Sequence, residues 1–292
     1  TLAGAVSPDG LDWRPLAEPL IPALISDTQN VVARDEATGR YVGFFRSRYA
    51  RRRAVSTAET DDFTRWPRPR TILALPSARR ELYTNAYCIY PYNPELHFLF
   101  PALYDRPTDG FSLACFASLD RQVWERIAEV LVEPRDVAGG PDGMVCAGVG
   151  LAPLDRGRRI GLPLHHTPRL HDHYLPPKSP EPGYYWLTWE RDRLAGVVTE
   201  DEAVFGTLPL RMPAGRLKVN ARTHATGGLR IGLWGSDGFP VPGYGPEDCE
   251  LMRGDLPGRI VSWGGRRELP RDESLRLEVR LSRGKLFALQ VA

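Results

Sequence analysis

The sequence predicts an all-β protein, and three observations lead to that fold class. Proline and glycine are both frequent, with 27 and 28 residues among 292, which favours short strands joined by turns. Short apolar runs recur along the chain, whereas apolar residues at helical spacing are scarce. An acidic turn followed by tryptophan also recurs, with steps of 53, 58 and 65 residues between the tryptophans. Four antiparallel strands at a period of about fifty residues are typical of a β-propeller blade.

The tryptophan motif has three clear copies and one looser copy. In each clear copy an aspartate stands four residues before the tryptophan, at Asp9, Asp62 and Asp120. Aspartate side chains accept hydrogen bonds from nearby backbone amides, so we interpret these residues as structural turns that resemble the Asp boxes of sialidases. The copies span residues 7–13, 60–66 and 118–124, with the looser one at 187–194.

Each repeat predicts an inner strand, a short turn, a second strand, a polar loop and a third strand, after which the aspartate turn leads into a fourth. The expected strands are 31–33, 41–45 and 54–57 in the first repeat, 86–90, 96–103 and 111–117 in the second, and 145–151, 160–164 and 184–189 in the third.

These repeats predict a five-bladed β-propeller over residues 1–204. Residues 1–20 have the pattern of the end of a blade, and 27–75, 82–135 and 143–200 each make one more. Because propellers close with about four or more blades, we expect one or two further blades to precede Thr1.

The pattern changes after residue 204, and residues 205–292 predict a C-terminal β-sandwich. Short alternating strands are separated here by Gly and Asp turns, without the tryptophan motif. The expected strands are 216–219, 229–234, 250–253, 260–263, 275–281 and 286–291.

Composition narrows the classes of partner. The formal net charge is +2, so we expect no nucleic-acid partner, and no apolar run is long enough for a membrane helix. The four cysteines (88, 115, 146 and 249) lack metal-ligand spacing and are expected to be free thiols. We expect no cofactor. Oligomeric state stays open, as does a cytoplasmic or secreted location, because the chain opens without a signal-peptide pattern.

Three carboxylates precede the predicted inner strands by a few residues, namely Asp27, Glu81 and Asp142. In a propeller, this position and the loop between the second and third strands lie at the same face. The matching loops are residues 46–53, 104–109 and 165–174. A ring of carboxylates with arginine, histidine and tyrosine around it suits cleavage of a glycosidic bond. One carboxylic acid then protonates the leaving oxygen, while a second activates water or attacks the sugar.

The order of a propeller with central acidic residues and a C-terminal sandwich resembles the five-bladed glycoside hydrolases of families 32, 43 and 68. The chain is most similar to uncharacterised family-32-like proteins, which carry Ser-Pro-Asp-Gly-x-x-Trp and Asp-Thr-Gln-Asn. Those motifs stand here at residues 7–13 and 27–30, joined by Tyr83-Thr84-Asn85-Ala86 and Asp142-Gly143-Met144. The Trp-Met-Asn-Asp-Pro, Arg-Asp-Pro and Glu-Cys-Pro signatures of family 32 proper do not occur, so no nucleophile is transferred.

We therefore predict a glycoside hydrolase acting on a carbohydrate. Asp27 would be the base or nucleophile, Glu81 or a loop histidine the acid, and Asp142 would orient the substrate or tune a pKa. Arg48 and Asn85 would hold sugar hydroxyls or an anionic group. The expected substrate-binding residues are Asn30, Arg46, Arg48, Asn85, Tyr104, His165, His166, His171 and His173.

Two other functions stay open at this point. In a glycoside phosphorylase, the arginine and histidine loops would bind phosphate in place of activated water. In a non-catalytic carbohydrate-binding propeller, Asp27 would only cap a turn, Asp142 would form one, and Glu81 would pair with Arg79 or Arg80. The histidines at 165–173 could also bind a metal, but without an anchoring Cys or carboxylate at clear spacing we expect a loop that lines a sugar or phosphate site.

Overall fold

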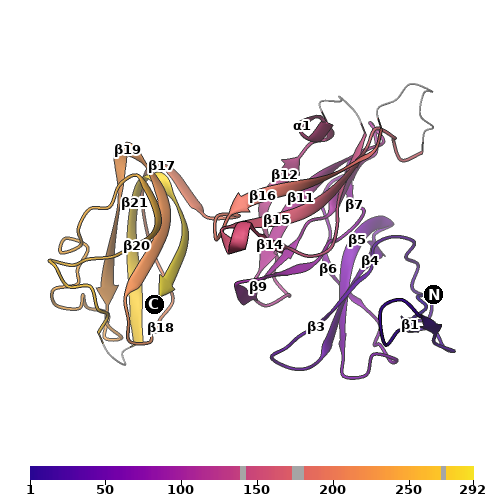
Figure 1. Cartoon of the computed structure of the whole chain (residues 1–292), viewed down its shortest axis with the longest axis horizontal. Coiled ribbons are helices and arrows are strands. Elements are labelled where there is room, and N and C mark those ends of the chain that lie inside the picture. Colours follow the sequence, from indigo (N-terminus) through magenta and orange to yellow (C-terminus); the bar gives the residue numbers. More distant parts are fainter. Residues whose placement is uncertain (139–142, 173–180, 271–273) are drawn as a thin grey trace. The chain divides into compact units, whose positions relative to one another are not determined.

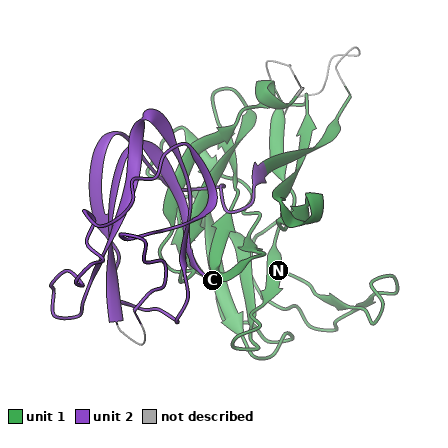
Figure 2. Ribbon diagram, turned by 60° about the vertical axis from the view of Figure 1, so that its left-hand side comes forward, with its two compact units in different colours: residues 1–188 green, residues 189–292 purple. Residues whose placement is uncertain are grey.

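The computed structural model describes residues 1–138, 143–172, 181–270 and 274–292 (Figure 1). Strands dominate these residues, in agreement with the predicted all-β class, and they belong to several sheets. The chain forms two compact units, residues 1–188 and 189–292 (Figure 2). In the part of the chain that the structure describes, no helix is long and apolar enough to cross a bilayer.

The first repeat forms a four-stranded antiparallel sheet in the order β3-β4-β5-β6. The first two strands pair as an antiparallel hairpin, with Val31 opposite Phe44 and Arg34 opposite Tyr41. Phe44 and Phe45 are fully buried, which anchors both faces of the second strand in apolar surroundings. The strands are β3 (Val31–Arg34), β4 (Tyr41–Tyr49), β5 (Arg52–Thr60) and β6 (Arg70–Leu73).

The second and third repeats join in one ten-stranded sheet. Its connection is a parallel pairing of Phe111 with Met144, so the two repeats are continuous. The predicted strand 96–103 is divided, because Pro101 lacks the N–H that a ladder needs. The strands are β7 (Arg80–Leu82), β8 (Cys88–Tyr90), β9 (Asn93–Leu99), β10 (Ala102–Asp105), β11 (Gly110–Ser118), β12 (Glu125–Val132), β13 (Met144–Ala147), β14 (Ala152–Leu154), β15 (Arg159–Thr167) and β16 (Gly183–Glu190).

Four short elements complete the first unit. A two-stranded ribbon pairs Ala5 with Pro15 near the N-terminus. One α-helical turn follows β12, and one 3₁₀ turn precedes β15. The elements are β1 (Ala5–Val6), β2 (Arg14–Pro15), α1 (Pro134–Ala138) and the 3₁₀ turn Asp155–Gly157.

The three clear tryptophan motifs form the same turn. The Asp9 carboxylate accepts from the amides of Leu11 and Asp12, and that of Asp120 accepts from Gln122 and Val123. In the middle copy, the carboxylate of Asp62 accepts from the Thr64 amide. Each indole N–H donates to the carbonyl three residues earlier, namely Trp13 to Gly10, Trp66 to Phe63 and Trp124 to Arg121.

The second unit is one five-stranded sheet in the order β17-β21-β19-β20, with β18 also on β21. Two pairs of predicted strands, 216–219 with 229–234 and 275–281 with 286–291, each merge into one 18-residue strand. Bulges such as the one between Thr223 and Gly228 interrupt the pairing, and the bulged residues explain why the alternation breaks in the sequence. The strands are β17 (Val197–Gly206), β18 (Leu210–Arg211), β19 (Leu217–Trp234), β20 (Asp255–Ile260) and β21 (Ser274–Val291).

The predicted boundary after residue 204 falls inside β17, which pairs with β21 of the second unit. Core residues of that unit include Trp263, Ile231 and Val279, all fully buried. The count of five blades and the sandwich assignment for residues 205–292 stay predictions. The four cysteines are free, as expected.

Candidate functional site

The candidate site starts from the hairpin of β4 and β5. The two strands pair without interruption from Tyr41–Thr60 to Tyr49–Arg52, so the predicted loop 46–53 is mostly strand. Only Ala50 and Arg51 form the turn, and both have positive φ, 48° and 64°. Two-residue hairpin turns of this kind match the twist of the strands. Arg46 therefore extends from a rigid ladder.

Arg46 forms an ion pair with Asp27. The two partners differ in exposure, because the Arg46 side chain is 6% exposed and that of Asp27 is 79% exposed. Burial lowers the pKa of Arg46, although a hydrogen bond from this group to Tyr83 opposes the shift. A guanidinium stays protonated in proteins, so the pair offers a fixed cation under a carboxylate that faces solvent.

Glu81 has a different environment, because its side chain is completely buried between two arginines. Arg53 Nη1 lies 2.8 Å from one carboxylate oxygen, and Arg106 Nε lies 2.7 Å from the other. Burial raises the pKa of Glu81, but the hydrogen bonds from Arg106 and Arg53 outweigh it and hold that pKa below its ordinary value. Glu81 is thus a clamped carboxylate anion. The open alternative of a pair with Arg79 or Arg80 is not what the structure contains, since Arg79 and Arg80 contact Asp105.

Tyr83 connects the two arginine centres. The guanidinium carbon of Arg46 lies 5.1 Å from the centre of its ring, and that of Arg53 lies 4.8 Å away. Cations at such distances are attracted by the negative face of an aromatic ring. The Tyr104 ring takes part as well, 5.0 Å from Arg53. Its hydroxyl donates to Asp109 at 3.0 Å, and burial followed by this hydrogen bond raises the pKa of Tyr104.

His171 also contacts Tyr83. Its Nε2 is 2.9 Å from the Tyr83 hydroxyl, and its Nδ1 is 2.9 Å from a carboxylate oxygen of Asp172. The Asp109 backbone and carboxylate fix this segment, because Asp109 accepts from the amides of both His171 and Asp172. Nδ1 is buried and makes no hydrogen bond among the described residues, so the Asp172 carboxylate is a close ionic neighbour and the Tyr83 hydroxyl is the hydrogen-bond partner of the ring.

Gln29 and Asn85 join the repeats instead of lining the site. Asn85 is fully buried and its amide donates to the carbonyls of Gln29 and Phe44, at 3.0 and 3.3 Å. The Gln29 side chain accepts from the Ala86 amide and donates to the Ala147 carbonyl. The predicted contact of Asn85 with substrate is therefore replaced by a positioning role, because no surface of its side chain is open.

The other predicted residues are spread around this centre. Arg48 is exposed on β4, and Asn30 exchanges hydrogen bonds with Ser26 and Thr28. The predicted loop 165–174 begins later than expected, because His165 and His166 still pair with β13. Consecutive strand residues face opposite sides of a sheet, so the His165 ring faces away from His166. It packs against Tyr184. Asp142 and His173 lie outside the described residues.

His166 is buried, at 1% exposure, and neither ring nitrogen has a hydrogen-bond partner among the described residues. Burial, followed by the nearby His165, lowers the pKa of His166. This imidazole is therefore neutral at ordinary pH. Gly143 packs against it so closely that an added Cβ would lie 3.2 Å from His166 Nε2.

One group in the described part of the chain has the donors for a metal ion. Asp109, His171 and Asp172 each offer a ligand atom, and these atoms lie within 4.8 Å of one another. Oxygen and imidazole ligands would suit several divalent cations. The absence of a metal stays a prediction.

Sequence reasoning did not select Tyr83, Arg53, Arg106, Asp109 or Asp172 as site residues. Tyr83 follows Glu81 by two positions, and Arg106 follows Tyr104 by two, so each shares a strand face with a selected residue. That period could have identified both. Asp109 and Asp172 carry no such signal, because they lie in turns beside β10 and β15.

No protein-family model matches the chain, and no curated protein sequence matches it. Several solved structures are similar to it. An N-acetylgalactosamine deacetylase from F. plautii has a TM-score of 0.37 and 15% identity over 53% of this chain, which spans 43% of that protein. A GH32 β-fructofuranosidase from Bombyx mori has a TM-score of 0.43 and 13% identity, covering 99% of this chain and 84% of that one.

An exo-β-1,3-galactanase from Phanerochaete chrysosporium has a TM-score of 0.28 and 10% identity, covering 99% of this chain and 89% of that one. A further structure described as a glycoside hydrolase has a TM-score of 0.40 and 14% identity over 63% of this chain, which spans 60% of that protein. At these identities and TM-scores the similarities carry no activity over to this chain.

Proposed function

We propose that the chain is a glycoside hydrolase in which Asp27 and His171, linked through Arg46 and Tyr83, are the two catalytic groups. The observation that carries the proposal is the continuous contact series from Asp27 through Arg46 and Tyr83 to His171. It joins a solvent-facing carboxylate to an imidazole that has the Asp172 carboxylate as a close neighbour. Cleavage of a glycosidic bond needs two such groups, one basic and one acidic.

Asp27 is the base or nucleophile in this proposal. The buried Arg46 cation pairs with one of its carboxylate oxygens, while the Asp27 side chain stays 79% exposed. A charged, accessible carboxylate can accept a proton from water or attack an anomeric carbon. The distance that separates it from the acid would set whether configuration is retained or inverted.

His171 is the favoured acid, because Glu81 cannot release a proton it does not hold. Glu81 keeps its charge between Arg53 and Arg106, whereas imidazoles in general exchange protons near neutral pH. Glu81 instead holds Arg53, whose guanidinium group lies near the Tyr83 and Tyr104 rings, together with Arg106. Its proposed contribution is to position the site.

A His171→Gln variant tests the acid. Protonation of the leaving oxygen matters most when the leaving group is a poor one. We expect kcat/KM for an unactivated disaccharide to fall about 10²–10⁴-fold, and to fall far less for a nitrophenyl glycoside of the same sugar. Steady-state kinetics on a panel of such substrate pairs measures both values.

His224→Gln is the matched control, since His224 is an exposed histidine of the second unit. It should leave both substrates near the wild-type rate. Equal losses on the two kinds of substrate in His171→Gln would contradict an acid role for His171.

A glycoside phosphorylase is the second candidate, and one observation favours it. Arg46 Nη1 and Arg53 Nε are buried donors without a hydrogen-bond partner among the described residues. Both belong to guanidinium groups, which suit phosphate. Sugar release that rises in proportion to inorganic phosphate, with sugar 1-phosphate as the product, would identify a phosphorylase. Release that is independent of phosphate supports the hydrolase.

A further inference from the structure

The second unit contains a cavity of about 720 Å³ that no part of the proposed chemistry uses. It opens where β17, β21 and β19 run side by side. Its lining includes Arg222, Thr223, His224, Arg283 and Lys285, together with Thr199. A volume of this size is within the range of about 300–1,000 Å³ that small-molecule sites occupy.

The backbone around the cavity is irregular on both sides of β21. Pairing shifts between Thr199 and Glu202 on β17, and between Thr223 and Gly228 on β19. Arg283, on β21 beside these two shifts, has a φ of 42°. A positive φ is energetically unfavourable for a residue other than glycine. Bulges redirect side chains and are frequent beside binding sites. Here they concentrate basic side chains at one point.

The charges in the cavity are unbalanced. Arg222 and Lys285 stand directly opposite each other on neighbouring strands, an arrangement of like charges that opposes folding. Arg222 has Asp255 as a partner at 3.1 Å. Arg283 and Lys285 have no carboxylate within 4.0 Å in the ranges that the structure describes, and Glu200 is the acidic residue of the lining. The whole chain carries only +2, so this concentration is local.

We infer that this cavity binds the sulfate or carboxylate group of an acidic saccharide. Arg283 and Lys285 would contact the anion, and the hydroxyls of Thr199 and Thr223 offer further donors. Anions with several oxygens accept hydrogen bonds from such groups together. That the ligand is a saccharide rests on the function proposed for the first unit, whereas its negative charge follows from the cavity alone.

The experiment is calorimetric titration of the full chain carrying Asp27→Asn, so that turnover does not consume the ligand. The probes are a sulfated oligosaccharide, an oligogalacturonate and a neutral oligosaccharide of equal length. We expect one or both acidic probes to bind more tightly than the neutral one, with the affinity for the acidic probes falling as NaCl rises. Arg283→Gly with Lys285→Gln should weaken binding at least about tenfold. Glycine is chosen because it adopts positive φ without strain.

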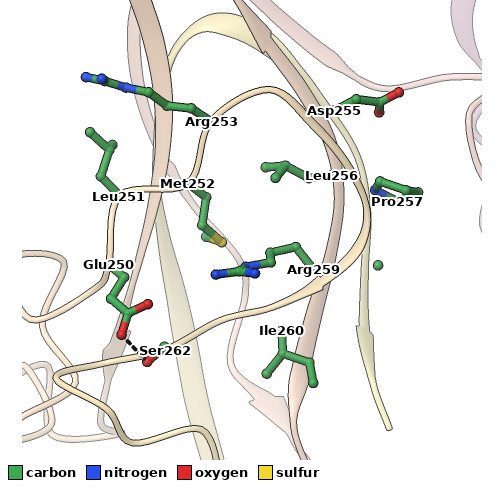
Figure 3. A pocket seen from close by; sticks show the side chains of 11 residues that line it. Glu250, Leu251, Met252, Arg253, Asp255, Leu256, Pro257, Arg259, Ile260 and Ser262 are labelled. Atoms are coloured by element: carbon green, nitrogen blue, oxygen red, sulfur yellow. Dashed lines mark hydrogen bonds between the residues drawn. The ribbon is translucent and has the colours of Figure 1, made fainter. Parts of the chain in front are cut away.

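Arg253→Gln with Arg259→Gln is the matched control. These arginines line a separate cavity of about 490 Å³, formed by β20 and residues 250–253 (Figure 3). In that cavity Glu250 accepts from the Ser262 hydroxyl, and Met252 is buried. The control pair should leave binding of the acidic probes unchanged.

Three results would overturn the inference. The first is that neither acidic probe binds. The second is that the Arg283→Gly, Lys285→Gln variant binds the acidic probes as tightly as the chain without these changes, at an unchanged melting temperature. The third is that a single-stranded DNA oligomer of the same charge binds as tightly as the acidic saccharides. Turnover by the wild-type chain is measured separately. If the acidic probes bind but the wild type cleaves no glycoside, only the proposed hydrolase activity is contradicted. If the wild type cleaves glycosides but the acidic probes do not bind, only the proposed role of the cavity is contradicted.

Discussion

Asp27→Asn is expected to lower kcat/KM for glycoside cleavage by about 10³-fold or more. Asparagine keeps the shape of the side chain and can still accept a hydrogen bond from Arg46, but it can neither take a proton nor attack carbon. Because the change also removes the counter-charge of the buried Arg46, the variant is expected to be less stable, so its kinetics are measured well below its own unfolding temperature. Kinetics on aryl glycosides and oligosaccharides, with thermal unfolding as the check on structure, measures the effect.

Asp61→Asn is the matched control for this prediction. Asp61 is also an exposed carboxylate in an ion pair with an arginine, at 82% exposure and 3.1 Å from Arg40 Nε. Asp61 directly follows the last residue of β5, whereas Arg53 lies near the first residue of that strand. Its variant should retain wild-type turnover. If the wild type and Asp27→Asn both show only background turnover while binding a sugar equally well, the chain is a carbohydrate-binding module and not an enzyme.

Local sequence is sufficient to predict the Asp27 half of the candidate site. The strands β3 and β4 and their turn lie within about twenty residues of one another, so alternation and turn residues determine the register that brings Arg46 to the side of Asp27. The tryptophan turns were predictable for the same reason, because Asp9 and Asp120 bond amides only two or three residues away.

The other half depends on pairing between distant strands, which no local pattern determines. Glu81 meets Arg106 because Tyr104 pairs with Glu81, and that register depends on the interruption of the predicted strand 96–103 at Pro101. His171 reaches Tyr83 across 88 residues of sequence. Asn85 looked accessible from its position in a motif, but its burial depends on carbonyls from Gln29 and Phe44. Burial of a polar residue is a property of the assembled sheets.

Glu81→Gln is expected to destabilise the first unit by about 3 kcal/mol. Glutamine has nearly the same shape, but its neutral amide leaves Arg53, which is 15% exposed, without a counter-charge. Arg106 is half-exposed and water can solvate it, so the loss falls at the lower end for a broken buried pair. Unfolding in urea, followed by tryptophan fluorescence, measures the difference.

Glu129→Gln is the matched control, because Glu129 also contacts two arginines, Arg80 at 3.2 Å and Arg126 at 3.6 Å, but is 62% exposed. Its cost should be below about 1 kcal/mol. Equal stability of the two variants would mean that the Glu81 clamp contributes nothing beyond a surface pair.

The same carboxylate gives the protein a predictable acid sensitivity. The pKa of Glu81 is lower in the folded chain than its ordinary value of 4.5, so the unfolded chain binds its proton first as the pH falls. The contribution of Glu81 to the free energy of unfolding is therefore complete above about pH 4.5 and is lost progressively as the pH falls toward the folded pKa. Glu81→Gln removes this group, so its stability should depend less steeply on pH below 4.5 than that of the wild type. Parallel slopes for the two proteins would mean that Glu81 is not held as an anion, which would restore it as a candidate acid in place of His171.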